Sequence, residues 1–187
     1  NRCRRQRQMC IRDRPYIILK WAESIDGYIT PKSKRDKRPH WISNELSRQI
    51  SHKWRSQEHA IMIGHNTVKH DTPILNTRNW NNINNRKFII GNEQIGLNGF
   101  EKIETKGKTL KALDICQYLH HKKIQSVIIE GGRFTLNKFL EEDVWDEVRV
   151  FKADTKIVDG IHAPKLKSKY CKKTKVGDDT LYFFKNY

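Results

Sequence analysis

The residues best suited to ligand chemistry lie where the apolar run 126–129 meets Glu130 and the pair Gly131-Gly132. Glycines let a ligand approach the backbone closely, and the N–H groups that begin a following helix attract anions. A glycine pair after a strand is equally typical of a plain tight turn, and the dinucleotide-binding pattern GxGxxG is absent. The segment therefore predicts a phosphate site only in combination with other residues.

Further polar residues also suit binding or proton transfer. Lys20 lies in the apolar run 16–22, where a buried charge needs a partner, although a lysine at a strand end can also extend to solvent. Thr67 and Asp71 follow a second apolar run, and Arg78 lies a few residues further on. Together they offer a hydroxyl, a carboxylate and a guanidinium that can hold a phosphate or a sugar. Each of them is also an ordinary loop residue when taken alone.

Strands and helices in alternating order would position these residues. Apolar runs predict strands at 16–22, 60–64, 87–91, 126–129 and 147–151, and a closing hairpin of 168–176 with 180–186. Helical spacing predicts a helix that Ser43 caps and that ends near Gln57, and further helices at 65–71, 109–121 and after Gly132. The expected inward residues are Leu46, Ile50 and Trp54, then Leu110, Leu113, Cys116 and Leu119, and finally Phe134, Leu136, Phe139 and Leu140.

This order predicts an α/β fold of three layers, in which helices cover both faces of a mostly parallel central sheet and an antiparallel hairpin ends the chain. The 187 residues suit one domain at 15–187. Residues 1–14 carry six arginines without any periodicity, and we expect a non-native or linker segment there.

Composition narrows the class of protein. The formal charge of +16 raises a nucleic-acid interpretation, but scattered lysines more often indicate a basic surface that also attracts small anions. No apolar run approaches the roughly 20 residues that a membrane span needs. The four cysteines form no disulfide framework, and the eight histidines show no metal-ligand spacing. We therefore expect a cytoplasmic protein without a metal site, a membrane segment or a nucleic-acid partner.

The ordered motifs carry more information than any one of them. They are Leu19–Gly27, Trp41–Ser43, Arg55, Thr67-Val68, Asp71, Pro73, Leu75, Arg78 and Glu130–Gly132. Over residues 15–187 this set resembles the reductase domain of the bifunctional riboflavin-biosynthesis deaminase/reductase, which has a dihydrofolate-reductase-like fold. The resemblance implies reduction of 5-amino-6-(5-phosphoribosylamino)uracil to its ribitylamino product with NADPH. The zinc deaminase signature is absent, and the resemblance suggests fusion to such a domain upstream.

The resemblance also implies roles for individual residues. For catalysis it suggests Lys20, assisted by Glu130 or Asp71. For the substrate it suggests Arg55, Leu75, Arg78 and Glu130, with the two arginines on the ribose phosphate. For the cofactor it suggests Ala22, Trp41, Thr67, Asp71, Asn92, Gly131, Gly132, Arg133, Phe134 and Thr135.

Two alternatives stay open at this point. One is a reductase of the same fold that acts on a pterin or on another pyrimidine. The other is a basic nucleic-acid-binding domain that stacks bases on Trp21, Trp41, Trp54 and Trp80, although most aromatic residues follow core patterns. The exposed edge of the predicted hairpin suggests a homodimer.

Overall fold

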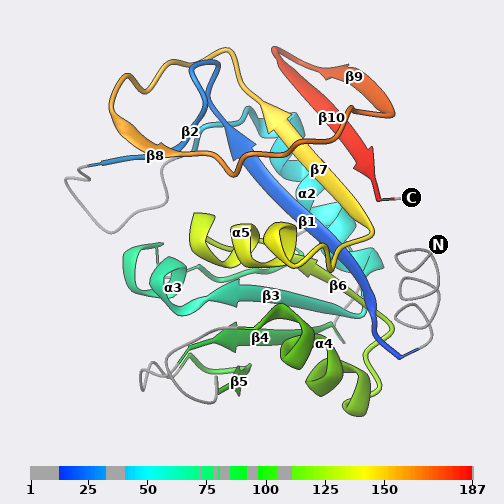
Figure 1. Ribbon diagram of the computed structural model, residues 1–187. Helices are drawn as coiled ribbons and strands as arrows, with labels where there is room; N and C mark the ends of the chain where they lie inside the picture. Colours follow the sequence, from blue (N-terminus) through cyan, green and yellow to red (C-terminus); the bar gives the residue numbers. More distant parts are fainter. Residues whose placement is uncertain are drawn as a thin grey trace.

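The fold is built on an eight-stranded sheet, which the computed structural model describes through residues 13–32, 41–71, 73–77, 80, 85–91, 97–104 and 111–186. Its strands are β1 (Tyr16–Glu23), β3 (Ala60–Gly64), β4 (Arg86–Ile90), β5 (Phe100–Ile103), β6 (Ser126–Ile129), β7 (Glu147–Lys152), β9 (Lys172–Val176) and β10 (Asp179–Lys185). They lie in the order β5-β4-β3-β6-β1-β7-β10-β9 (Figure 1).

The direction of the strands confirms the predicted fold class. Neighbouring strands from β5 to β7 are parallel, and β10 is antiparallel to both β7 and β9. All five residues of β3 are buried, as expected for a central strand that is covered on both faces. At the edge of the sheet, β9 exposes Lys172, Lys173 and Lys175.

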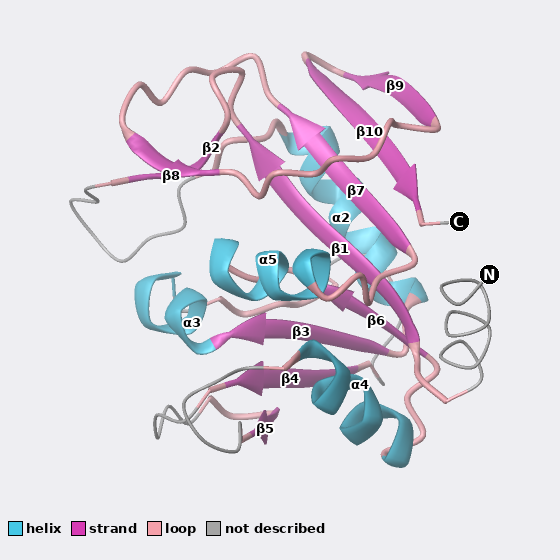
Figure 2. Cartoon of the chain, in the orientation of Figure 1, coloured by secondary structure: helices cyan, strands magenta, loops and turns pink. Residues whose placement is uncertain are grey.

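Helices cover the sheet on both faces. In the described residues they are α2 (Glu45–Gln57), α3 (His65–Asp71), α4 (Ala112–His121) and α5 (Arg133–Glu141). Figure 2 shows α4 and α5 in front of the sheet and α2 behind it. The two strands β2 (Tyr28–Pro31) and β8 (Gly160–His162) form a small separate sheet that the sequence did not predict. None of the helices in the described ranges is long and apolar enough to cross a membrane.

Alternation along β1 divides the core into two layers. Ile17, Leu19 and Trp21 pack with residues of α4 and α5 such as Leu119 and Phe139. Ile18 belongs to a separate apolar cluster on the α2 side of the sheet, and Trp54 of α2 packs against it. Because Lys20 has the same parity as Ile18, its side chain also belongs to the α2 side. The predicted three-layer arrangement is therefore confirmed.

The inward faces of the helices differ from the predicted ones. Leu46, Leu113 and Phe134 are 53%, 41% and 60% exposed, and Leu110 lies outside the described residues. The buried residues of α2 are Ser47, Ser51 and His52. Hydrogen bonds make this burial favourable, because the Ser47 hydroxyl donates to Asp179 at 2.6 Å and that of Ser51 donates to the Ser47 carbonyl oxygen at 2.9 Å.

The residue that caps α2 is Asn44, and the prediction of Ser43 was wrong by one position. The Asn44 side-chain oxygen accepts a hydrogen bond from the Ser47 backbone N–H at 2.9 Å. The Asn44 side chain also donates to the Val176 carbonyl oxygen at 2.6 Å. The cap therefore joins α2 to the C-terminal hairpin, which the local sequence pattern does not encode.

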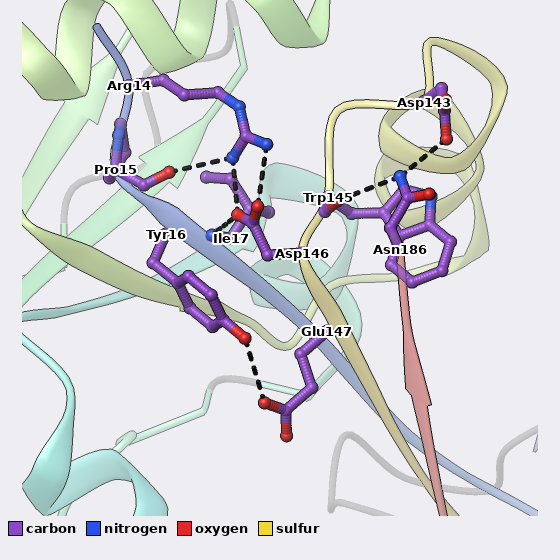
Figure 3. Close-up of polar contacts among 9 residues, drawn as sticks. All are labelled: Arg14, Pro15, Tyr16, Ile17, Asp143, Trp145, Asp146, Glu147 and Asn186. Carbon is purple, nitrogen blue, oxygen red and sulfur yellow. Dashed lines mark hydrogen bonds and ion pairs between the residues drawn. The ribbon is translucent and has the colours of Figure 1, made fainter. Parts of the chain in front are cut away.

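The N-terminal end of β1 is held by a buried ion pair (Figure 3). Arg14 forms a two-pronged contact with Asp146, with 2.9 Å between Nη2 and Oδ1, and the Ile17 backbone N–H donates to the same carboxylate at 2.7 Å. The side chain of Asn186 bonds to Asp143 and to the Trp145 carbonyl oxygen beside it. The folded part thus includes Arg14, one residue before the predicted boundary, while residues 1–12 lie outside the described ranges.

Candidate functional site

Three charged side chains from β1, α2 and the end of β6 meet inside the protein. Arg55 donates to both oxygens of Glu130 through Nε and Nη2, each at 2.7 Å. The Lys20 ammonium lies 3.5 Å from Glu130 Oε2. The three side chains are only 13%, 12% and 9% exposed for Lys20, Arg55 and Glu130. The glutamate that the sequence singled out is thus held by two cations.

The sheet explains this meeting. The Glu130 backbone N–H donates to the Met62 carbonyl oxygen at 2.9 Å, so Glu130 extends the pairing of β6 with β3 by one residue. Lys20 lies 5.9 Å from the centre of the Phe151 ring on the neighbouring strand, on the side that α2 covers. Arg55 comes from the last turn of α2. The cluster therefore stands near the carboxyl ends of the central parallel strands, where open α/β sheets bind ligands.

The electrostatics of the cluster favour the charged form of Glu130. Burial alone would raise the pKa of Glu130, but Arg55 and Lys20 outweigh that effect and hold it at about 2. Burial lowers the pKa of Lys20, and the Glu130 carboxylate offsets this only in part. For Arg55 the carboxylate outweighs burial and raises the pKa further. Of the two cations in the cluster, Lys20 is therefore the one whose pKa is lowered.

The glycine pair connects β6 to α5 beside α3. Gly132 donates its backbone N–H to Thr67 Oγ1 at 2.9 Å and precedes the first residue of α5. Among the described residues no side chain caps α5, and the first turn of this helix contains no acidic residue. An anion at this helix start therefore meets no competing carboxylate from that turn, which suits the phosphate of a dinucleotide.

Close packing fixes the start of α5 against β3. The Thr135 side chain is buried, and a Cβ added at Gly64 would lie 2.5 Å from Thr135 Oγ1. A Cβ at Gly131 would lie 3.1 Å from Thr135 Cβ. Gly64 is thus a packing residue of the site that the sequence reading missed, although a glycine that ends a buried apolar strand is a usable signal for close approach.

The segment 73–77 lies against α2. Leu75 has a left-handed backbone with φ of 47°, yet its side chain is only 6% exposed and belongs to the core cluster on the α2 side. The Asn76 carbonyl oxygen lies 2.7 Å from His52 Nδ1 and accepts from Arg55 Nη1 at 3.3 Å. His52 is buried, and the sequence pattern did not single it out. It is a second residue that the sequence reading missed.

The other predicted residues are more dispersed. Ala22 packs with Phe151 on the α2 side, and Arg133 is half-buried at the start of α5. Trp41 is 55% exposed, and the guanidinium of Arg48 lies 5.2 Å from its ring centre. Asp71 ends α3, but its side chain, Arg78 and Asn92 lie outside the described residues. The described structure therefore brings together Lys20, Arg55 and Glu130 on one side, and Thr67, Gly132 and Thr135 around the start of α5.

The chain is similar in sequence to proteins of riboflavin biosynthesis. A family model, the RibD C-terminal domain, matches residues 15–169. The riboflavin biosynthesis protein RibD of Aquifex aeolicus is 28% identical over 214 residues, which cover 94% of this chain and 59% of the relative. A 2,5-diamino-6-ribosylamino-4(3H)-pyrimidinone 5′-phosphate reductase of Archaeoglobus fulgidus is 22% identical over 177 residues, which cover 74% of this chain and 80% of the relative. The chain spans about half the length of the RibD relatives that it matches first.

Solved structures share the fold. A RibD structure from Acinetobacter baumannii, form 1, superposes with a TM-score of 0.76 at 22% identity and covers 91% of this chain and 58% of that chain. The dihydrofolate reductase of Enterococcus faecalis, complexed with NADP(H), superposes with a TM-score of 0.62 at 11% identity. The match covers 92% of this chain and 97% of that chain. The predicted dihydrofolate-reductase-like fold is therefore confirmed.

Proposed function

This chain belongs to the RibD C-terminal domain family, and we propose from that membership that it reduces a phosphorylated ribosylamino-pyrimidine with NADPH. The substrate is 5-amino-6-(5-phosphoribosylamino)uracil, and the product is the ribitylamino compound. The observation that carries the proposal is the buried cluster of Lys20, Arg55 and Glu130 near the carboxyl ends of the parallel strands. The activity in the name of the archaeal relative belongs to the same class of reaction.

The proposed step balances one hydride and one proton. Opening of the ribose ring gives a C=N bond at its first carbon; hydride adds to that carbon, and a proton adds to the nitrogen. NADPH supplies the hydride when bound. Lys20 guides the proton, because burial has lowered its pKa and Glu130 fixes the position of its ammonium. Asp71, at the end of α3, is the alternative partner for this transfer.

The substrate is held by both charge and shape. Arg78 is the proposed contact for the ribose phosphate, and Leu75 is the apolar contact. Arg55 directs Nε and Nη2 to Glu130 and Nη1 to the Asn76 carbonyl oxygen, so only the second N–H of each Nη is left for a phosphate. Glu130 faces the sugar hydroxyls, because a carboxylate readily accepts hydrogen bonds from hydroxyl groups.

For the cofactor we propose the start of α5 as the phosphate site. The absence of a side-chain cap and of acidic residues in its first turn supports this assignment. The proposed cofactor contacts around this helix start are Thr67, Gly131, Gly132, Arg133, Phe134 and Thr135. Further proposed cofactor contacts are Ala22, Trp41, Asp71 and Asn92.

Two related pyrimidines are candidate substrates, and an activity assay distinguishes them. The archaeal relative is named for a 2,5-diamino-pyrimidinone, which differs from the aminouracil at one ring substituent. The test follows NADPH oxidation by the full chain with the aminouracil, with the diamino-pyrimidinone and with dihydrofolate. We expect turnover with the aminouracil, slower turnover with the diamino-pyrimidinone, and none with dihydrofolate. Absence of turnover with both pyrimidines would overturn the proposal.

Lys20→Ala tests the assigned proton transfer, with Lys175→Ala as the matched control. Lys175 is an exposed lysine of the edge strand β9, and its ammonium donates to the Asp178 carbonyl oxygen at 3.3 Å. We expect Lys20→Ala to lower kcat by about 10² to 10⁴-fold, as loss of a general acid does, and Lys175→Ala to leave it unchanged. Near-normal kcat in Lys20→Ala would refute the role of Lys20.

Other properties remain part of the proposal. An upstream deaminase domain agrees with the greater length of the RibD relatives. A cytoplasmic location and a homodimer are proposals that rest on the sequence pattern alone.

A further inference from the structure

His52 lies on the same face of α2 as Arg55, one turn earlier. The residue is 6% exposed, and its Nδ1 lies 2.7 Å from the Asn76 carbonyl oxygen. A carbonyl oxygen only accepts hydrogen bonds, so this contact requires the hydrogen of the ring on Nδ1. His52 is therefore a buried donor directed at the backbone of the segment 73–77.

That segment is held mainly through its carbonyl groups. Arg55 Nη1 reaches the Asn76 carbonyl oxygen at 3.3 Å, and Lys87 Nζ reaches that of Ile74 at 3.3 Å. Leu75 lies between Ile74 and Asn76; its backbone has the unfavourable left-handed conformation, and its side chain lies in the core. A left-handed conformation costs a branched residue free energy, so the surrounding contacts must hold it. The 2.7 Å contact from His52 is the shortest of the three backbone contacts.

The same segment is connected to the charged cluster. Arg55 contacts the Asn76 carbonyl oxygen with Nη1 while Nε and Nη2 bind Glu130. A shift of residues 73–77 would therefore move the hydrogen-bond partner of the arginine that holds Glu130. The start of α5, proposed for the cofactor, has its own support from Thr67 and Gly64.

We infer that His52 is a positioning residue, which fixes the segment 73–77 beside the Arg55–Glu130 pair and so sets the affinity for the pyrimidine substrate without setting that for NADPH. The inference rests on the proposed function, because it assigns Leu75 and Glu130 to the substrate. His52 acts through the backbone of Asn76 and has no direct contact with the reacting atoms.

The experiment compares His52→Asn with His52→Gln in the full chain. Asparagine places its amide nitrogen close to the position of Nδ1, whereas glutamine places it one carbon further out. Both are polar, uncharged and smaller than or similar in size to histidine, so a role that is only structural predicts similar effects. His52→Phe keeps the ring but removes the donor. The readouts are KM for the pyrimidine, kcat, the Kd for NADPH by titration and the midpoint of thermal unfolding.

We expect His52→Gln and His52→Phe to raise KM for the pyrimidine about tenfold, as loss of one buried hydrogen bond does, with kcat within about threefold and an unchanged Kd for NADPH. His52→Asn should recover KM to within about threefold of the wild type. Equal KM values in the Asn and Gln variants would overturn the inference, as would an equal loss of NADPH affinity. If His52→Phe does not fold, the Asn and Gln pair still decides.

The two proposals fail in different ways. A wild-type chain that turns over neither pyrimidine refutes the proposed function, and the positioning role falls with it. An active wild type with indistinguishable Asn and Gln variants refutes only the positioning role.

Discussion

Two arginine–glutamate pairs in this protein have the same geometry and different surroundings. Arg55 binds Glu130 with two contacts of 2.7 Å, and Arg86 binds Glu101 with two contacts of 2.6 Å. The side chains of the first pair are 12% and 9% exposed, whereas those of the second are 32% and 40% exposed. Solvent screens the second pair, whereas the buried carboxylate of the first also has the Lys20 ammonium at 3.5 Å.

Glu130→Gln should therefore destabilise the protein far more than Glu101→Gln. The first substitution leaves Arg55 and Lys20 buried without a counter-charge, which costs about 3 kcal/mol of unfolding free energy. The second removes an exposed pair and should cost less than about 1 kcal/mol. Urea unfolding of both variants measures the difference. Similar losses in the two variants would show that burial does not determine the strength of the Glu130 pair.

The pH dependence of stability should reflect the low pKa of Glu130. Its pKa falls from the ordinary value of 4.5 to about 2 on folding, so its contribution is fully present above pH 4.5 and is lost as the pH falls toward 2. In urea unfolding from about pH 6 down to about pH 3, the stability gap between the wild type and Glu130→Gln should narrow below pH 4.5. A gap that stays constant over this range would contradict the assigned pKa.

Sequence patterns singled out some residues of the candidate site and not others. Lys20 and Glu130 stood out because each interrupts or ends an apolar strand. The contact between Arg55 and Glu130 joins residues 75 positions apart, and local periodicity does not encode which helix covers which strand end. His52 was not singled out, because a histidine among basic neighbours is typical of a polar helix face. Its hydrogen bond to a backbone carbonyl, which makes its burial possible, has no signature in the sequence.

At the scale of elements, the close contact between β3 and α5 depends on the absence of a side chain at Gly64. Gly64→Ala would place a Cβ 2.5 Å from Thr135 Oγ1 and should cost about 1 to 3 kcal/mol of stability through overpacking. Adding Thr135→Ala should recover part of this loss, because the two sites are in contact. Thermal and urea unfolding of the single and double variants measure the coupling. Strictly additive losses would contradict the close approach.

Gly132→Ala separates packing from binding at the same helix. Gly132 has φ of −60°, which any residue adopts, and an added Cβ would lie 3.4 Å from Thr67 Oγ1. Stability should therefore change by less than about 0.5 kcal/mol. If the cofactor phosphate approaches this backbone, the Kd for NADPH should rise roughly tenfold, equivalent to about 1.4 kcal/mol. An unchanged Kd would show that the cofactor phosphate does not bind at the glycine pair.

The central elements were predictable and the peripheral ones were not. β1, β3 and β6 are apolar runs whose burial on both faces leaves a clear pattern. β2, β5 and β8 have three or four residues each and few buried ones, so they lack both the length and the apolar content that mark a strand. The predictions of the inward faces of α2 and α4 were partly wrong. Serines are buried in α2 and an alanine is buried in α4, whereas only larger apolar residues were expected there.

At the scale of the whole molecule, Arg14 and Asp146 join the beginning of β1 to the beginning of β7. Arg14→Ala leaves a mostly buried carboxylate with only the Ile17 N–H of the contacts described above, and should cost about 2 kcal/mol, or roughly 4 to 8 °C in the unfolding midpoint. Lys138→Ala, which removes an exposed pair, should change the midpoint by less than about 2 °C. Equal midpoints in the two variants would mean that the domain does not need Arg14.

The lysines of β9 bear on how copies of this molecule meet. If two copies joined their sheets antiparallel through this edge, centred on Thr174, Lys173 of each copy would stand opposite Lys175 of the other. Like charges in facing positions destabilise such a junction, and lysines on an outer strand are a known protection against aggregation. The edge should therefore keep concentrated protein from growing into continuous sheets, and its charge argues against the homodimer through this edge that the sequence suggested.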